Sequence, residues 1–465
     1  MLQKDLSKIT KWGLATAVLI WMIGWLMLIP EDLSAQIAAI SAETVKNGRL
    51  TEQTGISTPI ISFSVGAMRL FGINQLSLHV PGFLAIVFSL FCVYRFTKAV
   101  AGAESAVLSV LILATAQATF LVNNELGDAS YLAACYIFML WQISCYVENK
   151  KITNLLLSLL GTVGLVLVKN TFPENASQWP TDPLLTLLVT FSPWTIFMIL
   201  ALIDLVQRLT FPDESRVGKH ELICLTAIVA PFIFSYLNPL RATFDVYMAY
   251  PVASVVTAAY IIRRLESDPG TFSGLLAYVH AVAAYAALAL LFCLVWFTFP
   301  ADNYYGLVHF MALLSVLTWL IFFAPVRNKL IVGCVVFAIG ANLVLTTYFY
   351  PNIYEYQAAA KLGIIARANG AGRDKLFSYQ AGTPYSLRFY SGVRVTEVDD
   401  FGKLVGMKNC LVYTHQDLLG EFKAIRPDLK ILGSCEEYPR RILDFRFLDP
   451  NTRASYVQSK VLIKL

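Results

Sequence analysis

The sequence predicts an α-helical polytopic membrane protein with a C-terminal α/β domain outside the membrane. Of its 465 residues, 57% are hydrophobic and only 14% are charged, whereas soluble globular proteins carry about 25% charged residues. The apolar residues gather in runs of roughly 20, the length that crosses a bilayer. Residues 351–465 break this pattern, because they hold 17 of the 36 basic residues and 12 of the 31 acidic residues. We therefore expect a membrane domain over 1–350 and a water-facing domain over 351–465.

Eleven apolar runs are expected to cross the membrane. They are 12–30, 80–99, 104–122, 128–147, 153–169, 184–207, 220–237, 245–262, 273–299, 305–324 and 329–350. The first run follows Lys4, Lys8 and Lys11, and no small-residue cleavage site comes before Glu31. We interpret it as a signal anchor rather than a cleaved signal peptide.

The basic residues between the runs predict the orientation of the chain. With a cytoplasmic N-terminus, fourteen Lys and Arg residues fall on the cytoplasmic side and five on the outer side before residue 351. Cytoplasmic loops carry the excess of Lys and Arg, so this orientation is favoured. An odd number of spans then places the C-terminal domain outside. We expect a multi-pass protein of the bacterial inner membrane with a periplasmic C-terminal domain.

The C-terminal region is expected to form a small α/β layer. Strands are predicted at 375–379, 393–398, 410–414 and 430–432, alternating with helical segments at 384–390, 400–404 and 416–425. Residues 455–465 alternate polar and apolar side chains, which suits an edge strand. The region contains no Gly-rich phosphate loop, nucleophile elbow or zinc spacing. We interpret it as a cap that shapes a substrate site or binds a partner.

A long polar segment, 31–79, separates the first two spans and is too polar to lie in lipid. It opens with the adjacent acids Glu31 and Asp32. A helical run over 33–45 and an amphipathic piece over 60–71 follow. Such a patterned loop with acids at its mouth is interpreted as the floor of an active site.

Charged residues also gather at the outer ends of other spans. They are Glu125 and Asp128, Lys169, and Arg241 with Asp245. Ionisable residues at span ends are functional candidates, because a carboxylate can act as a general base and a Lys or Arg can neutralise a phosphate. Two other interpretations account for the same residues. The acids can be solvated helix caps, and the basic side chains can snorkel to lipid headgroups. Composition alone does not separate an enzyme from a transporter.

Motifs in chain order resemble those of one family of membrane enzymes. They are the loop from Glu31-Asp32 through Leu70-Phe71-Gly72-Ile73-Asn74 to His79-Val80-Pro81, then Asn123 to Tyr131, Gly164 to Lys169, Phe191-Ser192-Pro193-Trp194, and Phe234 to Pro251, with Phe377 to Val395 in the tail. These motifs are similar to those of GT-C-type glycosyltransferases. That family of polytopic enzymes uses polyprenyl-phosphate sugars and includes protein O-mannosyltransferases and the lipid A aminoarabinose transferase.

The resemblance implies a GT-C-like fold and an inverting transfer of a sugar from a polyprenyl-phosphate donor. The acceptor would be a lipid, a glycan or a protein on the outer face. Asp32, with Glu31 second, would accept the proton of the acceptor. Lys169 and Arg241 would stabilise the departing phosphate.

The remaining site candidates have supporting roles in this interpretation. Asp128 would position the acceptor or hold a basic residue, and Tyr247 and Glu125 would contact substrate. The sequence departs from the family pattern at Ser57-Thr58-Pro59, which lacks the usual Lys, and at His79, where Arg is usual.

Membrane lipids are the expected surroundings, and no nucleic-acid partner is expected. No cofactor is assigned, and a divalent metal is left open. A transporter or flippase of lipid-linked saccharides and a catalytically degenerate scaffold stay as alternatives.

Overall fold

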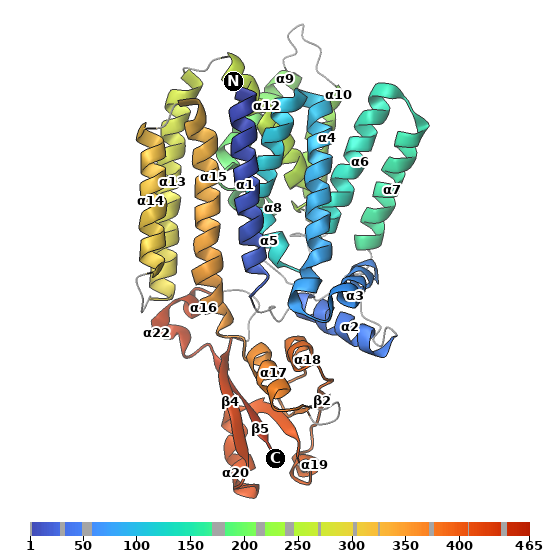
Figure 1. Cartoon of the computed structure of the whole chain (residues 1–465), viewed down its shortest axis with the longest axis vertical. Helices are drawn as coiled ribbons and strands as arrows, with labels where there is room; N and C mark the ends of the chain where they lie inside the picture. Colours follow the sequence, from blue (N-terminus) through green and yellow to red (C-terminus); the bar gives the residue numbers. More distant parts are fainter. Residues whose placement is uncertain are drawn as a thin grey trace.

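The protein is described by a computed structural model over residues 2–27, 33–48, 58–169, 182–210, 219–237, 246–267, 271–300, 305–323, 326–371, 376–407, 409–438 and 444–465. Long helices run side by side, and a small sheet lies beyond one end of them (Figure 1). We call that end of the helical bundle the sheet side, and the opposite end the far side.

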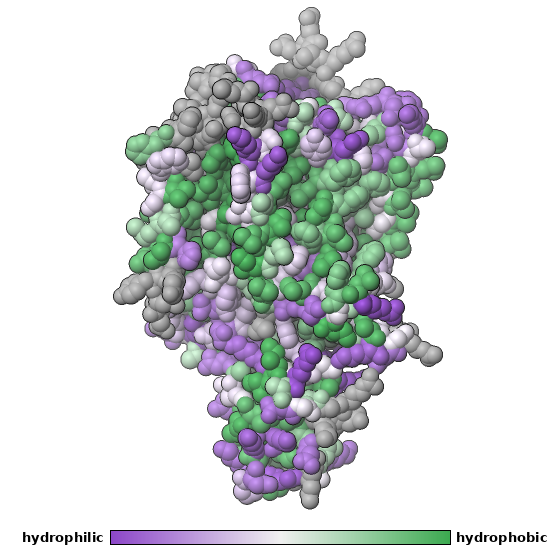
Figure 2. Space-filling model, viewed as in Figure 1, coloured by the Kyte–Doolittle hydropathy of each residue, from purple (hydrophilic) through white to green (hydrophobic). Residues whose placement is uncertain are grey.

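Apolar helices, most of them long, make up the body of the molecule. They are α1 (Leu2–Gly24), α4 (Gln75–Thr115), α6 (Ala129–Asn149), α7 (Ile152–Lys169), α8 (Pro183–Thr190), α9 (Thr195–Thr210), α10 (Lys219–Leu237), α12 (Ala249–Ser267), α13 (Thr271–Thr298), α14 (Tyr305–Phe323) and α15 (Val326–Val344). Among the described residues, six helical stretches are long and apolar enough to cross a membrane, or seven if α8 and α9 form one bent span. On the face seen in Figure 2, a broad apolar band covers the bundle between two polar zones. The predicted class is confirmed, whereas the count of eleven spans stays a prediction.

Helix α4 contains two legs that fold back on each other. Gly102 has φ 85° and ψ 176°, a conformation that a residue with a side chain rarely adopts. Thr97 Oγ1 and Ser109 Oγ lie 2.9 Å apart, although twelve residues of straight helix would separate them by about 18 Å. The two legs correspond to the predicted spans 80–99 and 104–122. Beyond Thr115 the second leg breaks, and it continues as the short helix α5 (Gln117–Asn124).

The predicted span 184–207 is not a straight helix, because α8 and α9 meet at an angle of 119°. The bend packs against the break between α4 and α5. There Trp194 Nε1 donates a hydrogen bond to Thr115 Oγ1 at 3.0 Å, and Gln117 N donates one to Ser192 O at 3.1 Å. The bend between α8 and α9 and the break between α4 and α5 thus provide hydrogen-bond partners for each other. Such pairing is needed because unpaired backbone groups are costly in an apolar interior.

Two helices of the first loop lie across the sheet side of the bundle (Figure 1). They are α2 (Leu33–Asn47) and α3 (Thr58–Phe71), which confirms the helices expected at 33–45 and 60–71. Ile37 and Ile40 of α2 are buried in the main core, as is Ile60 of α3. The loop is therefore packed against the membrane helices and not suspended in solvent.

The sheet has five strands in the order β2-β1-β3-β5-β4. They are β1 (Leu376–Ser378), β2 (Thr396–Glu397), β3 (Leu411–His415), β4 (Lys430–Glu437) and β5 (Gln458–Lys464). β1 is parallel to β2 and β3, whereas β5 is antiparallel to β3 and β4. The expectation of an edge strand at 455–465 was wrong, because β5 lies between two strands. Val461, Leu462 and Ile463 are consecutive and all buried, which is typical of a strand covered on both faces.

Helices connect the sheet to the bundle. α16 (Tyr350–Tyr354) ends the last long helix after a π-helical segment, and α17 (Ala358–Ala368) and α18 (Tyr385–Ser391) lie between the sheet and the bundle (Figure 1). α18 was expected from the sequence, but α17 was not. On the more distant part of the sheet lie α19 (Phe401–Val405) and α20 (Leu419–Ile425).

A network of charges joins α9, α10 and α12 at the far side. Asp204 lies 3.0 Å from Arg208, 3.3 Å from Arg263 and 3.4 Å from Arg264. Glu221 pairs with Arg208 and Arg263. Three arginines and two acids thus leave a net positive charge at this end of the bundle.

Candidate functional site

A small polar pocket lies on the sheet side, where α3, α4 and the α5–α6 junction meet. Its empty volume is about 270 Å³, counting the part that opens to solvent. The residues lining it are Ile60, Ser64, Leu78, His79, Gly82, Asn123, Glu125, Leu126, Gly127 and Tyr131. Tyr131 stacks on Phe63 with ring centroids 5.9 Å apart, which ties α6 to α3. Glu125, an expected substrate-binding residue, therefore belongs to this pocket.

Several buried polar atoms near this pocket have no hydrogen-bond partner within the described residues. They are His79 Nδ1, Asn123 Oδ1 and Trp25 Nε1. His79 and Trp25 stack with ring centroids 5.7 Å apart and nearly parallel planes. Buried polar groups are normally paired, so this combination of one donor and two acceptors can receive a polar ligand or water.

Asp128, at the start of α6, is 2% exposed. Its side chain makes no cap hydrogen bond to the helix. The reading of this acid as an ordinary helix cap is therefore not supported. Its role as a positioning acid stays a prediction.

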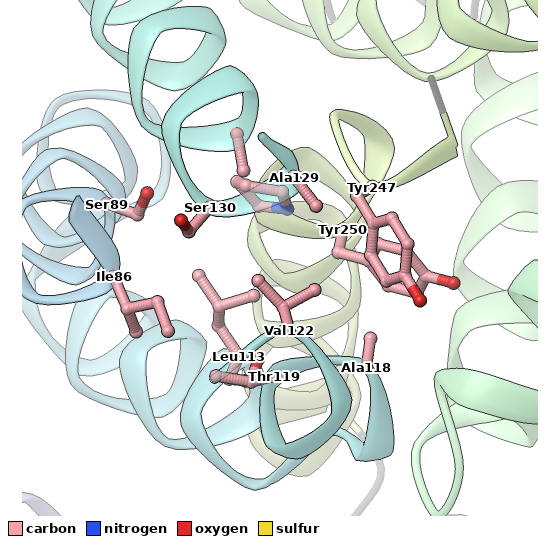
Figure 3. Close-up of a pocket in the computed structure, with 12 residues that line it drawn as sticks. Ile86, Ser89, Leu113, Ala118, Thr119, Val122, Ala129, Ser130, Tyr247 and Tyr250 are labelled. Atoms are coloured by element: carbon pink, nitrogen blue, oxygen red, sulfur yellow. The ribbon is translucent and has the colours of Figure 1, made fainter. Parts of the chain in front are cut away.

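An apolar pocket lies deeper in the bundle, between α4, α5, α6 and α12. Its empty volume is about 370 Å³. Ile86, Leu113 and Val122 contribute apolar side chains, and the hydroxyls of Ser89 and Ser130 point into the cavity (Figure 3).

Two tyrosines border the same cavity (Figure 3). The rings of Tyr247 and Tyr250 are 5.4 Å apart, and Tyr250 also stacks on Phe191 at 6.0 Å. Tyr247, an expected substrate contact, is thus placed at the apolar pocket.

The two pockets are neighbours. Gly82 lines the polar pocket and Ser130 lines the apolar one. A Cβ atom on Gly82 would lie 3.6 Å from Ser130 Oγ, an ordinary van der Waals contact. The polar pocket and the apolar pocket therefore lie directly next to each other at Gly82 and Ser130.

The other expected site residues are described only in part. Glu31, Asp32 and Arg241 lie outside the described residues. Lys169 ends α7, and its side chain is not described.

Glu125 lines the polar pocket and Tyr247 lines the apolar pocket, and the carboxylate is within electrostatic range of the phenol. Tyr350, at the start of α16, also lies within electrostatic range of the Glu125 carboxylate. Across the part of the chain that the structure describes, no three His, Cys, Asp or Glu side chains are grouped to hold a metal ion.

The site includes residues that sequence reasoning did not select. Trp25 was treated only as part of an apolar run, and His79 only as a departure from a motif. One signal in the sequence could have indicated this pair. Trp25 lies near the end of the first span, and His79 lies at the start of the second. This signal is weak, because helix phase across a long loop is not fixed by sequence.

Comparisons with known proteins confirm the resemblance to GT-C-type glycosyltransferases that was found in the sequence. Residues 59–172 match the family described as dolichyl-phosphate-mannose-protein mannosyltransferase. The crystal structure of ArnT from Cupriavidus metallidurans bound to undecaprenyl phosphate is similar, with a TM-score of 0.68 and 13% sequence identity over 97% of each chain. The apo state of that protein gives a TM-score of 0.66 at 13% identity, again over 97% of each chain. No curated protein sequence matches this chain.

Proposed function

We propose that this protein transfers a sugar from a polyprenyl-phosphate donor to a lipid, glycan or protein acceptor at the outer face of the membrane. The observation that carries the proposal is the polar pocket lying directly against the apolar pocket across Gly82 and Ser130. A polyprenyl-phosphate sugar has the same division into a polar head and an apolar tail. The similar ArnT structure, which contains undecaprenyl phosphate, supports this class of donor.

The acid pair Glu31-Asp32 is proposed to supply the general base. Helix α2 begins at Leu33, and Ser34 Oγ accepts a hydrogen bond from Leu126 N at 3.2 Å. Because Leu126 lines the polar pocket, the start of α2 lies beside this pocket. The acids directly precede α2 in the sequence, which supports their assignment to this site.

The proposed reaction is a single displacement that inverts the anomeric carbon. Asp32 accepts the proton of the acceptor hydroxyl while its oxygen bonds to the anomeric carbon and the bond to the lipid phosphate breaks. Lys169 and Arg241 are proposed to neutralise the departing phosphate. Asp128 is proposed to hold the acceptor or one of these cations.

We infer that the sheet side faces the periplasm and that the protein resides in a bacterial inner membrane. The net positive network of Asp204, Glu221 and three arginines at the far side supports this orientation, because positive charge gathers on the cytoplasmic side. The chain is proposed to divide into a membrane domain, 1–350, and an extracytoplasmic domain, 351–465.

The proposal is tested by measuring glycan transfer in membranes that contain Asp32→Asn or Glu31→Gln. We expect at least one variant to lose transfer while the amount of folded protein is unchanged. Asp399→Asn, which removes an exposed carboxylate from the C-terminal region, is the matched control and should retain transfer. Undiminished transfer by both Asp32→Asn and Glu31→Gln would contradict the assignment of the base.

A further inference from the structure

A buried ion pair joins the first loop to the C-terminal region. Arg388 of α18 donates two hydrogen bonds to Glu43 Oε1 of α2, from Nε at 3.1 Å and from Nη2 at 2.7 Å. The Arg388 side chain is 8% exposed and that of Glu43 19%. The guanidinium also lies over the ring of Tyr385, 5.2 Å from its centroid. Such a shielded, doubly hydrogen-bonded pair fixes geometry more strongly than an exposed pair does.

Further polar contacts surround this pair and connect the same elements. Lys46 Nζ donates to Gly392 O at 2.5 Å, Gln36 Nε2 to Tyr385 OH at 3.4 Å, and Tyr390 OH to Gln75 Oε1 at 3.1 Å. They extend along α2 and reach the start of α4. We call this set of contacts, with the Arg388–Glu43 pair, the α2–α18 junction.

Helix α18 is packed on both sides. Phe389 belongs to the main core with the membrane helices and α2, whereas Leu387 belongs to the core of the sheet region. Gly363 of α17 lets the two helices approach closely, since a Cβ there would lie 3.0 Å from Tyr390 Cβ and 3.2 Å from Leu387 O. The sheet region therefore presents α18 to α2 as a rigid element.

Helix α2 is held at both ends. Near its start, Ser34 is bonded to Leu126 at the polar pocket, and toward its end Glu43 is bonded to Arg388. Ten residues of α-helix separate Leu33 from Glu43, a rise of about 15 Å. A shift at the Glu43 end therefore moves the start of the helix, to which the acid pair Glu31-Asp32 is covalently attached.

We propose that Arg388 is a positioning residue, which acts through Glu43 to hold helix α2 with its start, at Leu33 and Ser34, beside the polar pocket. The inference rests on the proposed function, because it assigns a role in that reaction. The C-terminal region thereby contributes to catalysis without contacting the reacting atoms. Neither α18 nor Arg388 lines either of the two pockets, so we expect the junction to affect kcat more than donor affinity.

The test begins with Arg388→Leu in the full chain. We expect kcat for sugar transfer to fall by about 100-fold, the typical effect of a misplacement of about 1 Å. KM for the polyprenyl-phosphate donor should stay within about twofold. Glu355→Gln, which removes the exposed ion pair with Lys361 near the start of α17, is the control and should change neither constant.

The double variant Glu43→Leu with Arg388→Leu distinguishes a positioning role of Arg388 from a general loss of folded structure. Removing Arg388 leaves Glu43 as a partly buried charge without this partner, whereas replacing both partners of a shielded pair by apolar residues is often neutral or stabilising. We expect the double variant to recover kcat to within about tenfold of the wild type. A wild-type kcat in Arg388→Leu, or no recovery in the double variant, would overturn the proposal.

Hydrogen exchange provides a readout that does not depend on activity. Amides of 33–47 should exchange faster in Arg388→Leu and return to wild-type protection in the double variant. Unchanged protection of 33–47 in Arg388→Leu would also overturn the proposal. If the wild-type protein transfers no sugar, the proposed function fails, and the positioning role fails with it even where exchange shows the junction to be intact. If Asp32→Asn loses transfer while Arg388→Leu keeps it, only the positioning role fails.

Discussion

Trp25 and His79 stack with their ring centroids 5.7 Å apart and an interplanar angle of 3°. The contact joins the segment that follows α1 to the start of α4. Both rings are buried, at 7% and 5% exposure, and each carries a nitrogen without a partner among the described residues. The pair thus combines a structural contact with unused hydrogen-bonding capacity beside the polar pocket.

His79→Phe keeps a ring for this stack and removes the ring nitrogens. We expect the folded protein to persist and transfer to fall by about tenfold, which corresponds to the loss of one hydrogen bond worth about 1.4 kcal/mol. Activity per folded molecule is the measurement. His309→Phe, at an exposed position of α14, serves as the control. Full activity in His79→Phe would show that the imidazole only packs.

Gly82→Leu tests the connection between the two pockets. A Cβ at this position is tolerated, at 3.6 Å from Ser130 Oγ, but a longer side chain must enter one of the pockets. We expect Gly82→Ala to behave like the wild type and Gly82→Leu to raise KM for the donor at least tenfold. Donor-dependent initial rates measure the difference. Equal KM values in the two variants would show that the donor does not occupy the pocket beside Gly82.

Ala118→Leu tests the apolar pocket. Ala118 lines it and is 2% exposed, so added methylenes narrow the cavity, with an overpacking cost of about 1–3 kcal/mol. We expect KM to rise more for a long-chain polyprenyl donor than for a short-chain one. Val163→Leu, on the exposed face of α7, is the control. The same KM change for both chain lengths would argue that the tail binds elsewhere.

The sheet region should lose stability in mild acid through His415. Its Nε2 lies 2.8 Å from Lys460 Nζ, and Lys460 in turn lies 3.7 Å from Glu437. Burial, followed by the Lys460 charge, lowers the pKa of His415 below its usual 6.5, against the backbone of Gln380 and the Asp417 charge, which raise it.

The unfolded chain therefore binds this proton at a higher pH than the folded chain does. The contribution of His415 to the free energy of unfolding is fully present above pH 6.5 and is lost as the pH falls toward the folded pKa. We expect the Tm of the full chain to decrease between pH 8 and pH 5, and to decrease less in His415→Gln. Identical pH profiles would contradict this assignment.

Much of the fold was predictable because hydropathy and the local sequence pattern determine where most helices and strands form. The strands near 376, 396 and 411 and the helix at 385–391 formed where short apolar runs lie between turn residues. The position of β5 was not predictable in this way, because the pairing of a strand on both sides is decided by tertiary contacts. The reversal at Gly102 falls between two predicted spans, but the bend between α8 and α9 was hidden, since hydropathy measures composition and not chain direction.

The candidate site was predictable only in part. Glu125 and Tyr247 line the two neighbouring pockets, but their roles in binding substrate stay predictions. Arg388 and Glu43 are separated by 345 positions, and neither has a local signature. Such pairings follow from how the sheet region docks, which no pattern within either segment specifies.

The most direct test of the account uses the purified protein in liposomes with a radiolabelled polyprenyl-phosphate sugar and a glycan or lipid acceptor. Sugar transfer and movement of the donor between leaflets are measured in the same preparation. We predict transfer by the wild type that is abolished when Glu31→Gln and Asp32→Asn are combined. Movement of intact donor without transfer, or transfer that survives in the combined variant, would contradict the account.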